Sequence, residues 1–317
     1  MAFEVAALGE LLIDMVPLPA AEGTLNFAAK PGGAPGNAAV GLAKLGRSVC
    51  MLSKVGDDAF GRLLTRTIAA SGAATDRIIV SQHHRTGVAV VTLDEHGDRD
   101  FLFYRQDCAD ANYTPEEVAG DVISQARILH VNSLVLSAPV SASAERHAIA
   151  VAQKAAKIIS VDPNLRPLLW DSPQAMVAAA REVIAVANIL KVGADELTTI
   201  TGIADPLEAL ESLWHDKLLV AAITCAASGA IIVTPTVRVT IPGLAVKVVD
   251  TTGCGDSFMA AFLAGLLESE FDLSAENLAR IGGFACAAGA IVATIPGGMD
   301  AMPTRAALEI FMAERGL

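Results

Sequence analysis

The sequence has few of the features that mark several large protein classes. Its 317 residues include five scattered cysteines without a CxxC pair, so neither a disulfide framework nor a zinc knuckle is expected. Lysine and arginine number 23 against 35 aspartates and glutamates, and the resulting net charge of −12 argues against nucleic-acid and membrane-surface partners. Charged residues make up only 18% and hydrophobic residues 53%, which excludes disorder and predicts a sizeable core.

Export and membrane insertion are not expected either. Glu4 precedes any long apolar run and no basic leader stands before it, which favours a reducing cytoplasm as the location. Two charge-free stretches, 218–237 and 281–299, are long enough to suggest a membrane span. The first is better interpreted as two buried strands with a turn between them, and the second as an internal helix rich in small residues.

Strand-like apolar runs alternate with helical patterns along most of the chain. This alternation predicts an α/β fold of three layers, α/β/α, around a mainly parallel central sheet. The strand-like runs are 5–8, 49–53, 128–131, 158–161, 189–192, 219–223 and 231–233. Residues 86–93 and 99–104 instead indicate an antiparallel hairpin with its turn at 94–98. With the region around 11–27 it predicts a small β-sheet lid, at about 11–30 and 86–112 of a single domain spanning 1–317.

The strongest local signal is the segment DTTGCGDSF at 250–258, which follows two valines and runs into an apolar helical pattern. It predicts a strand, a glycine turn and a helix. Glycines allow backbone N–H groups to approach an anion, and a helix N-terminus adds partial positive charge, so a phosphate cradle is indicated. Asp256 would repel that phosphate unless it accepts a proton from an attacking hydroxyl. Helix capping is the alternative role for this carboxylate.

A second glycine cluster, GGAPGN at 32–37, precedes another helical pattern. Gly32 and Gly33 would let a ligand lie against the backbone, and Asn37 offers donors and an acceptor suited to a sugar hydroxyl. A plain loop is the alternative interpretation. Neither cluster fits a P-loop or a dinucleotide fingerprint, and HExxH, protein-kinase and GxSxG motifs are missing from the sequence.

Together the two clusters resemble the paired signatures of the ribokinase-like (PfkB) family of carbohydrate kinases. Further segments resemble its fructokinase branch: 9–14, 55–61, 103–105 and 162–166 with Leu169-Trp170. The resemblance extends from Gly9 to Thr304 and implies ATP-dependent phosphorylation of the primary hydroxyl of a small sugar, first of all D-fructose. Kinases of 2-keto-3-deoxygluconate share several segments, so this substrate, ribose and nucleosides remain alternatives. A non-catalytic sugar or nucleotide sensor is a more remote one.

The resemblance also implies a role for each matching residue. Asp256 would be the catalytic base, the amides of Gly253, Cys254 and Gly255 would form the anion hole, and Arg166 would offset developing charge. The sugar would be bound by Asp14, Gly32, Gly33, Asn37 and Arg105. The nucleotide side would be lined by Lys191, Thr224, Ser228, Gly229 and Thr251. Glu196 would hold Mg²⁺ through water, and Asp250 with the Thr252 carbonyl would belong to a monovalent-cation site, with K⁺ as the expected ion.

Three positions depart from the family pattern. Gly193 stands where the N-x-x-E motif has asparagine, so weaker metal affinity is expected with Glu196 retained. Ala226 replaces the first glycine of the nucleotide segment and would narrow nucleotide access. Cys254 replaces the usual alanine, either as an oxidation-sensitive thiol or as a small packing residue. Exposed edges of the lid also make a homodimer an expectation.

Overall fold

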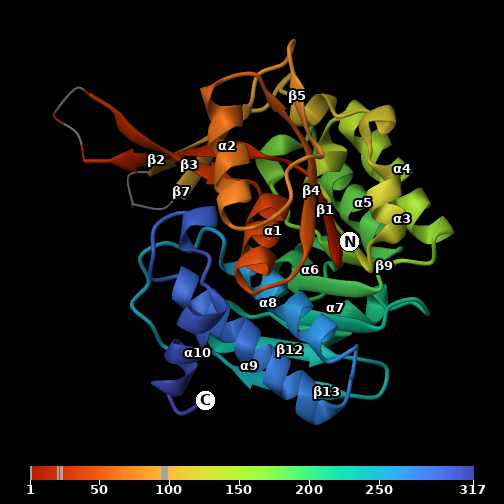
Figure 1. Ribbon diagram of the computed structural model, residues 1–317. Helices are drawn as coiled ribbons and strands as arrows, with labels where there is room; N and C mark the ends of the chain where they lie inside the picture. Colours follow the sequence, from red (N-terminus) through yellow and green to blue (C-terminus); the bar gives the residue numbers. More distant parts are fainter. Residues whose placement is uncertain (1, 20, 22–23, 94–98) are drawn as a thin grey trace.

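The computed structural model describes residues 2–19, 21, 24–93 and 99–317, so the turn expected at 94–98 lies outside the described residues. The central sheet has nine strands within this part of the chain, in the order β13-β12-β11-β10-β9-β8-β1-β4-β5 (Figure 1). Its strands are β1 (Val5–Leu8), β4 (Val49–Gly56), β5 (Ile78–Ser81), β8 (Ile128–Asn132), β9 (Ile158–Asp162), β10 (Ile189–Gly193), β11 (Val220–Thr224), β12 (Gly229–Val233) and β13 (Arg238–Pro242).

The predicted mainly parallel sheet is confirmed. All pairings from β11 through to β5 are parallel, whereas β12 and β13 add an antiparallel edge. Strands β5 and β13 were missed by the sequence analysis. β13 lies at the sheet edge, where only Ile241 is buried, so its residues do not form the continuous apolar run that marks a central strand.

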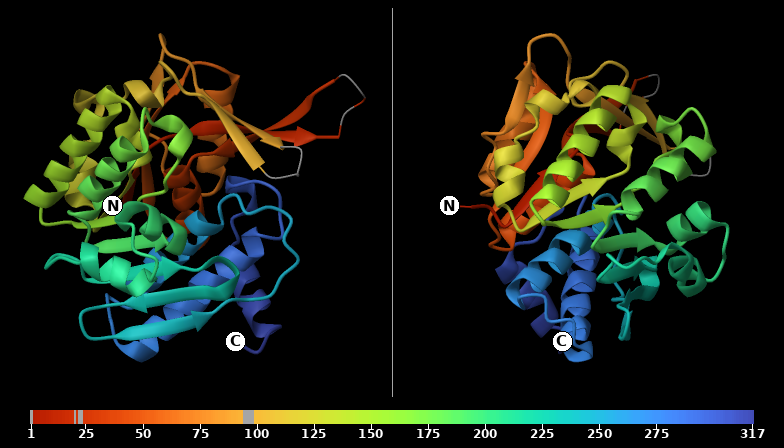
Figure 2. Two further views of the ribbon diagram at one scale, coloured as in Figure 1. Left: turned by 180° about the vertical axis from the view of Figure 1, so that it is seen from behind. Right: turned by 90° about the vertical axis from the view of Figure 1, so that its right-hand side faces the viewer.

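Helices cover both faces of the sheet, which gives the expected three layers (Figures 1 and 2). Successive residues of β1 point to opposite faces: Val5 and Ala7 belong to one hydrophobic cluster, Ala6 and Leu8 to the other. The first cluster is covered by α1 (Ala34–Lys44), α2 (Ala59–Ala70), α8 (Cys254–Glu268), α9 (Ala275–Val292) and α10 (Arg305–Ala313). The second is covered by α3 (Gly120–Gln125), α4 (Pro139–Lys154), α5 (Pro173–Ile184), α6 (Ala194–Thr201) and α7 (Pro206–Leu213).

Polar caps set where several of these helices begin. Side-chain oxygens at the N-cap accept hydrogen bonds from first-turn N–H groups at Asp58, Ser172, Asp205, Ser274 and Thr304. Helix α9 confirms the internal helix expected within 281–299. No helix in the described ranges is long and apolar enough to cross a membrane.

A second sheet of four strands forms beside the main one, in the order β3-β2-β6-β7, and is called the lid sheet below. Its strands are β2 (Leu12–Leu18), β3 (Asn26–Gly32), β6 (Gly87–Leu93) and β7 (Arg99–Tyr104). The expected hairpin is confirmed as the antiparallel pair β6–β7, while β2 pairs parallel with β6. The β2–β3 ribbon extends away from the body of the molecule (Figure 2).

Two local expectations are corrected by the structure. Val248 and Val249 are more than half exposed and lie in a loop, so the predicted strand before the DTTGCGDSF segment is wrong. Helix α1 begins at Ala34, directly after Gly33, so Asn37 lies within the helix rather than in the loop before it. Gly33 has φ +106°, and a Cβ there would collide with the Glu10 carbonyl oxygen. The glycine therefore permits the turn that aims α1 at the sheet edge.

Candidate active site

The candidate site lies where parallel strands of the central sheet end. Asn132, Asp162, Gly193 and Thr224 are the last residues of β8, β9, β10 and β11, and Gly193 and Thr224 are in register. Carboxyl ends of adjacent parallel strands meet at one edge, which is the usual position of ligand sites in open α/β sheets. The N-termini of α1 and α8 reach the same edge, so both glycine clusters of the sequence meet there.

The two clusters are joined by one hydrogen bond. Asn37 donates from Nδ2 to Oδ2 of Asp256, with 2.7 Å between the two atoms. Burial raises the pKa of Asp256 to about 6, the Asp162 charge adds to this, and the Asn37 hydrogen bond opposes it. The carboxyl is therefore poised to accept a proton near neutral pH.

The turn before Asp256 is held by a glycine cap and a buried carboxylate. Gly253 occupies the left-handed region at φ +81° and caps α8. Thr252 donates its N–H to Oδ1 of Asp250 at 2.7 Å, and Gly297 donates to Oδ2 at 3.1 Å, so the buried Asp250 carboxylate fixes the turn. Cys254 is partly buried and packs against the apolar core, which agrees with the packing interpretation of its side chain.

The lid sheet brings Asp14 toward this turn. Asp14 lies on β2 opposite Lys30 of β3, and a Cβ on Gly32 would collide with its carboxylate, so Gly32 makes room for Asp14. Burial raises the pKa of Asp14 to about 7; Arg166 opposes this shift, and Asp256 adds to it. The exposed Arg166 also lowers the pKa of Asp256. The charge of Arg166 therefore acts on both carboxyls.

Glu10 is a buried polar residue at this edge that the sequence analysis missed. Its Oε1 accepts from the Ala34 amide and its Oε2 from Nδ2 of Asn132, both at 2.8 Å, so it ties the start of α1 to the end of β8. Burial raises the pKa of Glu10 to about 7. In the sequence Glu10 is an acidic residue two positions after a fully apolar strand, and its role becomes apparent only once its burial is known, because a buried charge needs a specific partner.

Arg105 follows β7 but is buried rather than extended into open solvent. Its Nε donates to Oδ2 of Asp110 at 2.7 Å and its Nη1 to Oγ of Ser137 at 2.9 Å. The third nitrogen, Nη2, is buried and has no hydrogen-bond partner among the described residues. Nη2 is therefore the nitrogen of this arginine whose N–H groups have no acceptor among the described residues.

Lys191 lies closer to the anion cradle than its expected place on the nucleotide side implies. Its buried ammonium donates to both carboxylate oxygens of Asp162, at 2.9 and 3.1 Å. A Cβ added to Gly255 would lie 2.8 Å from Nζ of Lys191, so a larger residue there would displace the ammonium. The structure thus places a paired cation directly beside the glycine turn.

Of the remaining nucleotide-side residues, Thr224, Ser228 and Gly229 lie at the β11–β12 turn and Thr251 lies in the segment before α8. Thr224 ends β11, Gly229 has φ +100°, and Ser228 and Thr251 are exposed. Ala226, the residue that departs from the family pattern, has φ +47°, a conformation that favours glycine. The backbone therefore keeps the shape of a glycine-containing turn although the glycine is missing.

The Glu196 carboxylate is anchored by two backbone amides. Its two carboxylate oxygens accept from the amides of Gly193 and Leu165, both at 2.8 Å. Each oxygen retains a lone pair for a water molecule, which suits Mg²⁺ because this ion keeps several of its waters. No cluster of three or more His, Cys, Asp or Glu side chains within the described ranges could hold a metal directly. The expected water-mediated role of Glu196 fits these contacts.

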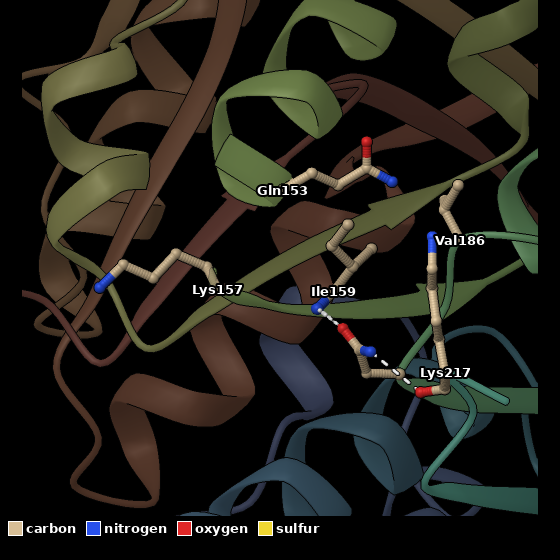
Figure 3. A pocket seen from close by; sticks show the side chains of 6 residues that line it. Gln153, Lys157, Ile159, Val186 and Lys217 are labelled. Atoms are coloured by element: carbon tan, nitrogen blue, oxygen red, sulfur yellow. Dashed lines mark hydrogen bonds between the residues drawn. The ribbon is translucent and has the colours of Figure 1, made fainter. Parts of the chain in front are cut away.

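A surface hollow of about 330 Å³ lies elsewhere, at the amino ends of β9 and β10 (Figure 3). It is lined by Gln153, Lys157, Ile159, Val186, Asn188 and Lys217. Asn188 there accepts from the Ile159 amide and donates to the Lys217 carbonyl oxygen. These residues lie at the amino ends of the strands, whereas the candidate site lies at the carboxyl ends. The hollow is therefore not part of the candidate site.

The comparison with known proteins covers both glycine clusters. Residues 2–305 match the family model described as pfkB family carbohydrate kinase. The chain belongs to this family. Its members are phosphotransferases with an alcohol group as acceptor, so the PfkB resemblance and the assignment as an enzyme are confirmed.

Curated and solved PfkB relatives match over nearly the whole chain. Fructokinase-2 of Solanum habrochaites is 37% identical, covering 95% of this chain and 93% of its own. The fructokinase of Xylella fastidiosa with bound ATP superposes with a TM-score of 0.91 at 29% identity, covering 99% of both chains. A Vibrio cholerae fructokinase with fructose, ADP and calcium has a TM-score of 0.86 at 31% identity, covering 97% of this chain and 98% of its own. The ribokinase-like fold is thereby confirmed.

Proposed function

We propose that this PfkB kinase transfers the γ-phosphoryl group of ATP to the primary hydroxyl of D-fructose and forms fructose 6-phosphate. The observation that carries the proposal is the hydrogen bond from Asn37 to Asp256, because it joins the sugar-side segment to the phosphate cradle. The fructokinase names of the relatives support fructose as the sugar.

In the proposed mechanism, Asp256 accepts the proton of the attacking hydroxyl. Its raised pKa of about 6 suits this role, since the carboxylate is ionised at neutral pH and still basic enough to take the proton. The amides of Gly253, Cys254 and Gly255 and the charge of Arg166 stabilise the negative charge that spreads over the transferring group. The ammonium of Lys191, paired with the Asp162 carboxylate, lies beside Gly255 at the same place.

The sugar is held from the other side. Asp14 and Asn37 bind hydroxyls, Gly32 and Gly33 let the ring lie against the backbone, and Arg105 offers the N–H groups of Nη2. The adenine nucleotide follows the turn after β11, along Thr224, Ser228, Gly229 and Thr251. Bound Mg²⁺ would neutralise charge on the ATP phosphates, with Glu196 holding it through water. Asp250 and the Thr252 carbonyl would hold K⁺ beside the anion hole.

The test is sugar-dependent release of ADP with MgATP and K⁺, comparing fructose, ribose, adenosine and 2-keto-3-deoxygluconate. Fructose should be the preferred substrate, and Asp256→Asn should lower kcat by about 10²- to 10⁴-fold. Asp216→Asn is the matched control, because Asp216 is exposed and lies next to Lys217 of the remote hollow. Full activity of Asp256→Asn would remove the base assignment, and turnover of none of the sugars would favour a sensor.

We also propose that the kinase acts in the reducing cytoplasm as a homodimer formed through the lid sheet. All five cysteines are free thiols, which suits a reducing compartment. Leu18, Leu102 and Tyr104 on the lid sheet are each about half exposed or more, a pattern suited to contact with a second copy. Light scattering after gel filtration should give twice the 32.7 kDa chain mass, and a monomer would remove this proposal.

A further inference from the structure

The guanidinium of Arg105 is already neutralised inside the protein. Its side chain is 4% exposed and that of its ion-pair partner Asp110 is 2% exposed, with 2.7 Å between Nε and Oδ2. Asp110 is the first residue of a 3₁₀ helix (Asp110–Asn112), so the loop after β7 returns its carboxylate to the arginine. A buried pair of this kind is not screened by water, and the carboxylate cancels most of the arginine charge.

The pair is held in place by further contacts. The second oxygen of Asp110 accepts from Sγ of Cys108 at 2.7 Å, and Nη1 of Arg105 is engaged by Ser137. Burial lowers the pKa of Arg105, but Asp110 and Glu10 raise it, so Glu10 is a second carboxylate close enough to act on the guanidinium. Arg105 therefore cannot leave Asp110 for a ligand without exposing a buried carboxylate.

The rest of the sugar side is also acidic. Glu10, Asp14 and Asp256 interact electrostatically in this region, and Asp14 feels the charges of both others. A sugar acid bound there would bring one more negative charge into a partly buried site whose buried arginine, Arg105, is already paired with Asp110. An uncharged sugar has no such cost, and its hydroxyl can accept from the one unpartnered donor, Nη2 of Arg105.

We propose that Asp110 is a specificity-determining residue: by neutralising Arg105, it restricts the site to uncharged sugars and excludes sugar acids. Arg105 then serves as a hydrogen-bond donor to a hydroxyl rather than as the cation for a substrate carboxylate. The inference rests on the proposed kinase function and sharpens its substrate class.

The test compares kcat/KM for fructose and for 2-keto-3-deoxygluconate in the wild type and in Asp110→Asn. Asparagine keeps the shape of the side chain and one acceptor for Nε while removing the charge. The ratio of the keto-acid value to the fructose value should rise at least tenfold. Glu117→Gln is the matched control, since it removes a carboxylate from another largely buried ion pair, with Lys54, and should leave the ratio unchanged.

The outcomes separate this inference from the proposed function. Fructose phosphorylation with an unchanged ratio in Asp110→Asn overturns the role of Asp110 and leaves the kinase intact. Efficient turnover of the keto acid by the wild type overturns it as well. Turnover of neither substrate removes the proposed function and this inference with it.

A measurement on the wild type covers the case in which Asp110→Asn does not fold. The keto acid, added to the fructose reaction at the KM of fructose, should leave the rate unchanged. Competitive inhibition with an inhibition constant near that KM would mean that the site accepts a carboxylate, and would overturn the inference.

Discussion

Nδ2 of Asn37 and Oδ2 of Asp256 lie 2.7 Å apart although 219 positions separate the two residues in the chain. The hydrogen bond favours the ionised carboxylate, while burial favours the protonated one and brings the pKa to about 6. Because the base must be ionised, kcat/KM of the wild type should rise with pH through about 6 and then level off.

Replacing Asn37 by alanine should move this acid limb to higher pH. Loss of a hydrogen bond to a charged group is worth about 1.5–3 kcal/mol, which corresponds to an upward shift of about one to two pH units. The measurement is kcat/KM for fructose between pH 5 and 9. Asn277→Ala, at the remote start of α9, is the control. An unchanged midpoint in Asn37→Ala would show that Asn37 does not set the ionisation of the base.

The Lys191–Asp162 pair should contribute strongly to stability. Lys191→Met leaves the Asp162 carboxylate buried without its partner, and we expect the free energy of unfolding to fall by about 3–5 kcal/mol. Urea denaturation measures this loss. The exposed pair Arg146–Glu182 provides the control, because Arg146→Met should cost less than about 1 kcal/mol. Equal losses in the two variants would mean that burial does not increase the contribution of the Lys191–Asp162 pair to the free energy of unfolding.

Ala226 should gain from substitution by glycine. A φ of +47° costs an L-residue about 1–2 kcal/mol of stability, and glycine avoids this cost. Part of the gain is lost again, because glycine has a larger conformational entropy in the unfolded chain. We expect Ala226→Gly to raise the free energy of unfolding by up to about 1 kcal/mol, measured by thermal denaturation. Ala227→Gly in the same turn is the control and should lower it, since Ala227 is not among the positive-φ residues. Destabilisation by both changes would contradict strain at Ala226.

Glu145 on α4 is a fully buried carboxyl, and neither of its oxygens has a hydrogen-bond partner among the described residues. Burial, with Glu10 and Glu182 adding to it, raises its pKa well above the ordinary 4.5. The unfolded chain loses this proton above about pH 4.5 whereas the folded chain keeps it, so stability falls as pH rises.

Glu145→Met should remove this loss. We expect the gain in free energy of unfolding to be larger at pH 8 than at pH 5, because the carboxyl is protonated in the folded chain and ionised in the unfolded chain at the higher pH. Urea denaturation at the two pH values measures it, with Glu211→Met on α7 as the exposed control. A gain independent of pH would show that Glu145 is already ionised in the folded protein.

The sequence predicts the architecture well because periodicity and glycine placement are local signals. The parallel strands, the hairpin β6–β7 and the start of α8 follow from runs of a few residues. The edge strand β13 is not predicted from apolar periodicity, because most of its residues are not buried. At Val248 and Val249 the error is the opposite one: two β-branched residues predict a strand, but they are exposed in a loop.

The site is predicted less completely, because its contacts are long-range. Asn37 and Asp256 are identified by their motifs, but their hydrogen bond is not. The pairing of Arg105 with Asp110 is invisible in the sequence pattern although only five positions separate them. This ion pair depends on the conformation of the loop after β7, and the hydrophobic periodicity of the sequence carries no information about that loop. Glu10 and Glu145 become informative only once burial is known.

The separation of Asn37 from Asp256 has a consequence for the order in which the protein is made. Helix α1 packs on α8, and both contribute to the same apolar cluster together with α9 and α10. During synthesis, α1 therefore leaves the ribosome more than two hundred residues before the surface that covers it. A nascent chain that ends before α8 exposes the apolar side of α1 and lacks Asp256. Neither the first hydrophobic cluster nor the candidate site can therefore be complete until the last fifth of the chain has emerged.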